Sequence, residues 1–160
     1  MTFRLLTVLV LLAACASAPR PLEYADVAIE GLAFEADSAD AIERFGKPDS
    51  TRTLPRRMPA GGDGSSTVPI LHYPGLALLF GEDGLLSGFD ISAPPHRTVR
   101  GLVVGADSVT VERLYGPPRS QGALVWLYSS EDGLIEMALR IHDGRVTSIT
   151  IGAVEFARAR

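Results

Sequence analysis

An internal repeat constrains the fold of this chain more than any other feature of its sequence. Residues 31–50 align without a gap with residues 101–120, at an offset of 70, and 8 of the 20 positions are identical. Self-similarity of this kind predicts that one structural unit occurs twice. The identical pairs are Gly31/Gly101, Leu32/Leu102, Ala36/Ala106, Asp37/Asp107, Ser38/Ser108, Gly46/Gly116, Pro48/Pro118 and Ser50/Ser120.

Each repeat contains the start and stop signals of one short helix. The Asp-Ser pairs at 37–38 and 107–108 can accept hydrogen bonds from the free amide groups of a helix start. About two turns later, Gly46 and Gly116 suit the left-handed residue that ends a helix, and a proline follows each of them two positions on. We therefore expect one helix in each repeat, ending just before the glycine.

The remaining segments have the pattern of antiparallel strands. Asp-Gly turns separate apolar runs, and this dipeptide favours hairpins because both residues tolerate positive φ. We expect an α+β fold of two tandem repeats, each with a strand, a short helix packed on the sheet, and a meander of about three antiparallel strands. The expected meander strands cover 75–80, 85–91, 123–129, 134–141 and 145–151.

The same patterns predict the boundaries along the chain. A signal peptide covers 1–14, a proline-containing tether covers 15–25, and the two repeats cover 26–94 and 95–160. Residues 52–67 interrupt the first repeat with the segment RTLPRRMPAGGDGSST. Their composition predicts a flexible loop without a counterpart in the second repeat.

The first 15 residues, MTFRLLTVLVLLAAC, have the parts of an export signal. Arg4 precedes an apolar run that is too short to span a bilayer, and small residues follow the run. The last four of these 15 positions are Leu12, Ala13, Ala14 and Cys15. They resemble the bacterial lipobox, which implies cleavage before Cys15, a thioether link to diacylglycerol and an N-acyl chain on the new amino group.

This resemblance also implies a location. Two or more acyl chains give stable membrane anchoring, whereas one chain is marginal. Ala16 follows the cysteine, and by similarity to enteric sorting rules a residue other than aspartate there implies the outer membrane, with the domain facing the periplasm. The alternative is an ordinary secretory leader cleaved near 16–18, with an incidental cysteine.

The second repeat carries a pattern that resembles two families. The segment LYGPP at 114–118 ends its helix, and WLY at 126–128 begins eight residues later. This pattern resembles the SmpA/OmlA family, the small lipoprotein of the β-barrel assembly machinery. It equally resembles the tandem-repeat β-lactamase inhibitor proteins. In the first repeat LHY at 71–73 replaces the Trp-x-Tyr element. SmpA/OmlA proteins have one copy of the unit, whereas this chain has two.

Charge and cysteine content exclude some classes of function. The formal net charge is −4, and removal of the leader with Arg4 leaves 14 basic and 19 acidic residues, or −5. That balance argues against nucleic-acid binding, which needs a basic surface. Because Cys15 is the only cysteine, no disulfide can form within the mature domain.

The sequence offers no set of residues typical of catalysis. His72, His96 and His142 lie on different segments without the spacing of a metal or acid–base site. The chain has no Gly-x-Ser-x-Gly motif, and the glycine-rich segment 61–66 lacks the Gly-Lys-Ser/Thr ending of a phosphate loop. We therefore expect no catalytic residue, no metal, no cofactor and no small-molecule substrate.

Two groups of side chains are candidates for an interaction surface. Arg56 and Arg57 are basic residues in the predicted loop that can touch lipid phosphates or an acidic partner, or can simply be solvated. Trp126, Tyr128 and Tyr73 can form an aromatic binding surface, or can fill the core of a small sheet instead.

These features favour a non-catalytic function at a membrane. The leading hypothesis is an envelope lipoprotein that acts as a protein-binding or scaffold module with an envelope protein as its partner, and outer-membrane assembly is the process that the resemblance implies. The alternative is an inhibitor or immunity-type protein of an envelope enzyme such as a β-lactamase or a peptidoglycan hydrolase. An enzyme is the third hypothesis.

Overall fold

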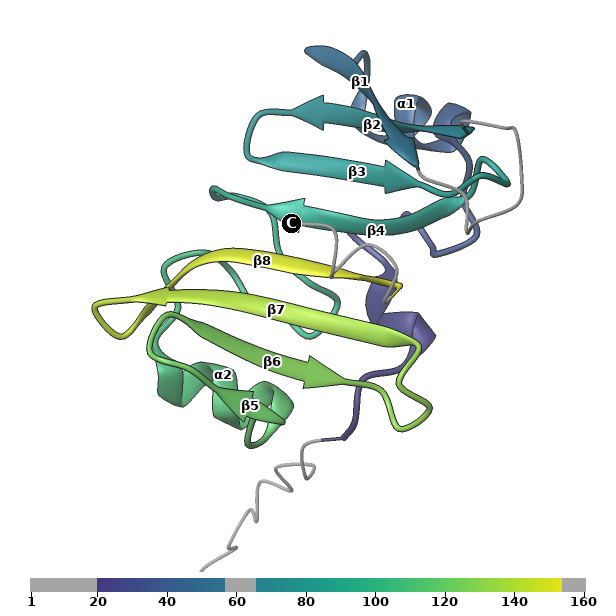
Figure 1. Ribbon diagram of the computed structural model, residues 1–160. Helices are drawn as coiled ribbons and strands as arrows, with labels where there is room; N and C mark the ends of the chain where they lie inside the picture. The colour runs from purple at the N-terminus through teal and green to yellow at the C-terminus, as the bar shows by residue number, and fades with distance from the viewer. Residues whose placement is uncertain (1–19, 57–65, 154–160) are drawn as a thin grey trace, which may run out of the picture.

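The computed structural model describes residues 20–56 and 66–153 and combines helices with one eight-stranded antiparallel sheet, so the predicted α+β class is confirmed (Figure 1). No helix in this part of the chain is long and apolar enough to cross a membrane. The elements are η1 (Tyr24–Val27), α1 (Ser38–Phe45), β1 (Ser50–Arg56), β2 (Ser66–Tyr73), β3 (Leu76–Phe80), β4 (Leu86–Ile91), α2 (Ser108–Tyr115), β5 (Ser120–Gln121), β6 (Val125–Ser129), β7 (Ile135–His142) and β8 (Arg145–Ala153).

The sheet joins the two halves of the chain through their last strands. Its order is β1-β2-β3-β4-β8-β7-β6-β5, so each half forms a meander of four strands, and β4 pairs with β8 at the middle (Figure 1). Asp90 pairs with Thr150 there. Asp90 lies seven positions after Asp83, and Thr150 lies seven positions after Asp143, and each of these aspartates begins an Asp-Gly turn. The two four-stranded meanders thus join side by side into one continuous sheet.

Two glycines allow β4 and β8 to approach closely at this seam. Gly88 pairs with Gly152. A Cβ atom at Gly88 would lie 2.6 Å from the carbonyl oxygen of Ile151, and one at Gly152 would lie 2.9 Å from the carbonyl oxygen of Ser87. Real Cβ atoms do not approach backbone oxygens so closely, and the pair of strands therefore requires glycine at both positions.

The helix signals work as predicted. The Asp37 side chain accepts hydrogen bonds from the amides of Ala39 and Asp40, and the Asp107 side chain accepts one from Thr110. Gly46 and Gly116 follow the last helical residues with φ values of 80° and 75°, which only glycine adopts without strain. Both helices thus have the lengths that their local sequence dictates.

One face of the sheet carries the core. Alternate residues of each strand point toward α1, α2 and η1, and the register aligns them in rows across all the inner strands. One such row is Leu71, Leu78, Phe89, Ile151, Met137 and Tyr128. All of these side chains are buried. The α-helices cover the two halves, while η1 contacts β4 and β8 and covers the seam.

The described residues correct the predicted boundaries in three places. The tether predicted over 15–25 is shorter, because Leu22 is buried and η1 begins at Tyr24. The loop predicted over 52–67 is also shorter, because β1 continues through Arg56 and β2 begins at Ser66. Within the described residues no regular strand precedes either helix, where isolated bridges lie instead, and each meander has four strands rather than about three.

Candidate functional site

The predicted lipid-attachment region and the basic loop fall mostly outside the described residues. This applies to Leu12, Ala13, Ala14 and Cys15, and also to Arg57. Arg56 is the last residue of β1, an edge strand of the sheet. The chain enters the described part at Arg20, which is therefore the structural reference point for the predicted anchor.

The predicted aromatic surface is not exposed. Trp126, Tyr128 and Tyr73 are all buried in the core on the helix-covered face. Tyr128 packs against Tyr115 at the end of α2, and Tyr73 packs against Phe45 at the end of α1. These side chains therefore belong to the core, and Tyr128 also lines the groove described below.

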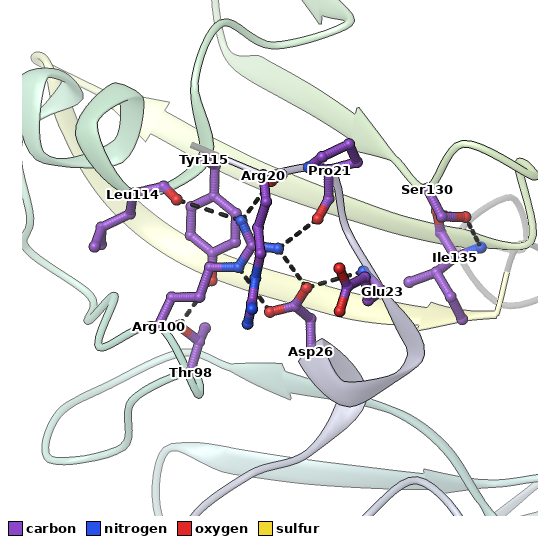
Figure 2. A network of polar contacts seen from close by, with 10 residues as sticks. All are labelled: Arg20, Pro21, Glu23, Asp26, Thr98, Arg100, Leu114, Tyr115, Ser130 and Ile135. Atoms are coloured by element: carbon purple, nitrogen blue, oxygen red, sulfur yellow. Dashed lines mark hydrogen bonds and ion pairs between the residues drawn. The ribbon is translucent and has the colours of Figure 1, made fainter. Parts of the chain in front are cut away.

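The most developed polar site is a buried ion pair between Arg100 and Asp26 (Figure 2). The Arg100 Nε and Nη2 atoms donate to the two carboxylate oxygens of Asp26 at 2.7 and 2.6 Å. The side chains are only 7% and 2% exposed. Burial alone would lower the pKa of Arg100, but the hydrogen bond and the charge of Asp26 outweigh that effect and raise the pKa. Arg100 therefore stays charged.

Three backbone carbonyl groups complete the surroundings of Arg100. Its Nη1 atom donates to the carbonyl oxygens of Arg20 at 2.7 Å and Leu114 at 3.3 Å, and its Nη2 atom donates to Pro21 at 2.6 Å (Figure 2). With Asp26 this makes five contacts, which matches the number of N–H donors on a guanidinium. Arg100 thereby binds the entering chain to the end of α2.

Tyr115 packs against this ion pair. The guanidinium carbon of Arg100 lies 4.7 Å from the centre of its ring, which is a cation–π distance. The hydroxyl groups of Tyr115 and Thr98 are 2.9 Å apart, and the Leu102 amide donates to Thr98 Oγ1. Burial raises the pKa of Tyr115 to about 12, so the phenol is neutral at physiological pH. We refer to Arg100, Asp26, Tyr115 and Thr98 as the Arg100 junction.

A second polar site occupies the matching position of the other half. His96 Nδ1 lies 3.1 Å from Glu30 Oε1, and His96 Nε2 lies 3.0 Å from the carbonyl oxygen of Pro74. The His96 ring also meets Phe45 edge-on, with centroids 6.4 Å apart. At the offset of 70, His96 matches Asp26, Glu30 matches Arg100 and Phe45 matches Tyr115. We refer to His96, Glu30 and Phe45 as the His96 junction.

A groove lies beside the Arg100 junction where the chain enters the described part. Its volume is about 380 Å³. We call it the exit groove, and it is lined by Arg20, Pro21, Leu22, Tyr115, Gly116, Pro117, Arg119, Tyr128 and Ser129. Tyr128 is a buried part of this lining: its hydroxyl donates to the Gly116 carbonyl oxygen, and burial raises its pKa to about 12. Most of the lining is apolar or aromatic, and Arg20 and Arg119 contribute the positive charges.

The three histidines lie on different segments of the structure. His72 is in β2, His96 belongs to the junction described above, and His142 is an exposed residue 3.1 Å from Asp143 at the turn between β7 and β8. Within residues 20–56 and 66–153, no group of three or more histidine, cysteine, aspartate or glutamate residues could hold a metal ion.

The sequence reasoning missed both junctions. Arg100 and Asp26 are 74 positions apart, so no local pattern connects them. A signal was nevertheless present, because the repeat alignment extends backward from residue 31 to residue 26 at the same offset. At this offset Asp26 aligns with His96, and Glu30 aligns with Arg100. Each contact, Asp26 with Arg100 and Glu30 with His96, therefore joins one residue of each half. None of residues 26–30 is identical to its counterpart in 96–100, so the exchange of polar residue types is the one indication of contacts between the halves in this segment.

Comparison with known proteins identifies similar folds but no family. No protein-family model and no curated protein matches the sequence. The structure is similar to a cysteine-rich secretory protein from Staphylococcus aureus subsp. aureus Mu50, with a TM-score of 0.52 and 15% identity over 88% of this chain. This chain spans 49% of that protein's length. A DUF4309 family protein from Bacillus subtilis has a TM-score of 0.45 and 17% identity, covering 78% of this chain and 83% of its own.

Proposed function

We propose that this chain is a lipid-anchored envelope protein that acts as a non-catalytic protein-binding or scaffold module. The observation that carries the anchor is the four-residue lipobox match ending at Cys15, only five positions before Arg20. Arg20 and Pro21 are bound by Arg100 through their carbonyl oxygens. A short chain that is fixed to the folded domain at one end suits attachment to a bilayer at the other.

We further propose that the two halves are tandem copies of one unit. Support comes from the 8 identities in 20 positions and from the two helices, which start and end at an offset of 70. The pairing of Asp90 with Thr150 across the seam and the exchanged side-chain contacts of the junctions also fit two copies related by a two-fold axis. The proposed membership of a SmpA/OmlA-like or inhibitor-like group rests on the sequence resemblance alone.

The polar networks support a module that binds rather than catalyses. In the Arg100 junction every donor of the guanidinium has an acceptor, and the tyrosine hydroxyl bonds to Thr98. Such a saturated network holds chain segments together and has no group left to move a proton to or from a substrate. The face of the sheet opposite the described helices is the surface on which a protein partner would bind.

The anchor is tested by changing Cys15 to Ala in the full chain and fractionating the host cells. We expect the wild-type chain to stay with membranes after a carbonate wash and the variant to be released. Mass spectrometry of the N-terminal peptide should find acyl chains in the wild type alone. A Cys15→Ala variant that remained bound after the wash would contradict the anchor.

The scaffold function is tested by crosslinking in intact envelopes, followed by purification of the chain. We expect a defined envelope protein to be recovered at a constant ratio, and its recovery to fall when residues of the open sheet face, such as Arg140 and Thr147, are changed. Both are exposed, so their replacement should leave the fold intact. Recovery of abundant proteins only, with normal barrel-protein levels in a deletion strain, would count against this function.

The sheet face opposite the described helices also favours a second candidate, an inhibitor of an envelope enzyme. Toward β1 this face is buried at Val68, Ile70 and Leu79, so a contact surface on it lies over β4, β8 and β7, where short side chains such as Ala138 and Thr150 are partly exposed. Purified protein should then inhibit a β-lactamase or a peptidoglycan hydrolase. No inhibition at micromolar concentration would exclude this candidate.

A further inference from the structure

We propose that the edge of the sheet formed by β5 and β6 rests on the membrane surface. This inference depends on the anchor at Cys15 proposed above and adds a fixed orientation to it. The edge consists of Arg119, the two strands and the turn between them, which includes Leu124. The occupant of this surface is the bilayer interface, including its lipid phosphates.

The length of the connecting chain limits the orientation. Five residue steps separate Cys15 from Arg20, and they reach at most about 18 Å when fully extended. A globular domain of this size is roughly 35 Å across. Because the Arg100 junction holds Arg20 and Pro21 on the domain, the chain between anchor and domain is no longer than about half the domain's width. Only the side of the domain around the exit groove can therefore reach the membrane.

The β5–β6 edge borders that exit. Arg20, Arg119 and Ser129 all line the exit groove, and Ser129 is the last residue of β6. The five residues of β6 extend about 13 Å at the usual rise of a strand. Leu124 lies one step further, so the edge from Ser129 back to Leu124 spans about 17 Å, a length similar to that of the connecting chain.

The composition of the edge suits a bilayer interface. Of the eight exposed large apolar side chains in the described part, three occur between 124 and 127, and Leu124 is 63% exposed and Leu127 37% exposed. Arg119 is exposed beside them and donates one hydrogen bond, to Ser129 Oγ at 3.1 Å. Apolar side chains can enter the boundary between headgroups and acyl chains, while an arginine binds phosphate.

Two other surfaces of the domain fit the membrane less well. The turn between β6 and β7 carries Glu131 and Asp132, which anionic headgroups repel. The repeat-1 edge of the sheet, β1, lies at the opposite end of the strand order and is beyond the reach of the connecting chain (Figure 1).

The test places a fluorophore on single introduced cysteines in the full, acylated chain, where the acylated Cys15 cannot react. Leu124→Cys and Leu127→Cys report on the proposed edge, and Ile42→Cys on α1 is the matched control, since Ile42 is also exposed, at 45%. The protein is reconstituted in vesicles of phosphatidylethanolamine and phosphatidylglycerol that contain lipids with a spin label near the headgroup. We expect several-fold stronger quenching at 124 and 127 than at 42.

The outcomes separate the orientation from the anchor. If Cys15 carries acyl chains but quenching at 124 and 127 does not exceed that at 42, the proposed orientation is wrong and the anchor stands. If Cys15 carries no acyl chain, the anchor and the orientation both fail. Emission of Trp126, the only tryptophan and a buried one, checks that each labelled variant is folded.

Discussion

The two junctions occupy matching positions but differ in how firmly they bind the chain. The Arg100 junction is a bidentate pair with 7% and 2% exposed side chains, and it also binds three carbonyl groups. The His96 junction has one contact between the side chains, with 12% and 28% exposure, and one contact to a carbonyl group. The firmer junction is the one beside the chain that leads to Cys15. This difference indicates that the strong pair fixes the N-terminal segment, while its counterpart closes a loop within the domain.

The largest expected effect comes from replacing Arg100 with Ala. This change leaves the Asp26 carboxylate buried without its partner, which typically costs about 3–5 kcal/mol. We expect that loss in the free energy of unfolding, measured by urea denaturation with the fluorescence of Trp126. Hydrogen exchange should show residues 20–27 released. Arg113→Ala, at an exposed arginine of α2, is the control and should cost little. A loss for Arg100→Ala as small as that of Arg113→Ala would remove the distinction between the junctions.

A double variant tests whether the pair acts as a unit. Asp26→Ala with Arg100→Ala removes both charges, so the double variant should be clearly more stable than the sum of the single losses predicts. We expect a coupling free energy of about 1–3 kcal/mol from the complete cycle. The corresponding cycle at Glu30 and His96 should give a smaller value, because water screens that pair better. Equal coupling at both sites would contradict the structural comparison.

The local signals of the helices could be predicted from the sequence, whereas the junctions could not. Asp37 and Gly46 act on amide and carbonyl groups within four residues, and their effect depends on no distant segment. Arg100 depends on Asp26 and Pro21, which approach it only after the sheet has joined the two halves. The tether was predicted too long for the same reason. The composition around Pro19 and Pro21 is that of a linker, but contacts with distant residues hold the chain from Arg20 onward: the Arg100 bonds to Arg20 and Pro21 and the bridge from Leu22 to Ser130.

Burial of the aromatic residues was also open at the sequence level. An alternating strand places every second side chain on one face, but the pattern alone does not say which face is covered. Trp126 and Tyr128 are buried because α2 packs on their side, while Leu127 between them is exposed. The accessible residue of this segment is therefore Leu127, which occupies the position that the Trp-x-Tyr motif leaves unspecified.

Alkaline pH should affect the two junctions differently. The pKa of Tyr115 is raised to about 12 by burial, whereas the matching residue of the His96 junction is Phe45, which does not ionise. The folded state holds the Tyr115 proton more tightly than the unfolded state. Its contribution to stability is therefore complete below about pH 10 and is lost as the pH rises through about 12.

Tyr115→Phe tests this difference. The variant loses the hydrogen bond to Thr98, and we expect a cost of about 1 kcal/mol at neutral pH. The decline in stability between about pH 10 and 12 should become shallower in the variant. Tyrosinate absorbance should also lose one high-pH step, and Tyr128→Phe is a matched comparison because burial raises that pKa to about 12 as well. An unchanged titration in Tyr115→Phe would contradict the burial of this phenol.

The smallest effect is expected at the His96 junction. His96→Ala removes the contact with Glu30 and the contact with the Pro74 carbonyl group, but both partners can turn to water because Glu30 is 28% exposed. We expect a loss of up to about 1 kcal/mol, as for other partly solvated pairs. Hydrogen exchange near residues 74 and 96 should increase while residues 20–27 stay protected. Release of residues 20–27 in this variant would mean that the two junctions open together, and that the N-terminal segment depends on the whole seam rather than on Arg100.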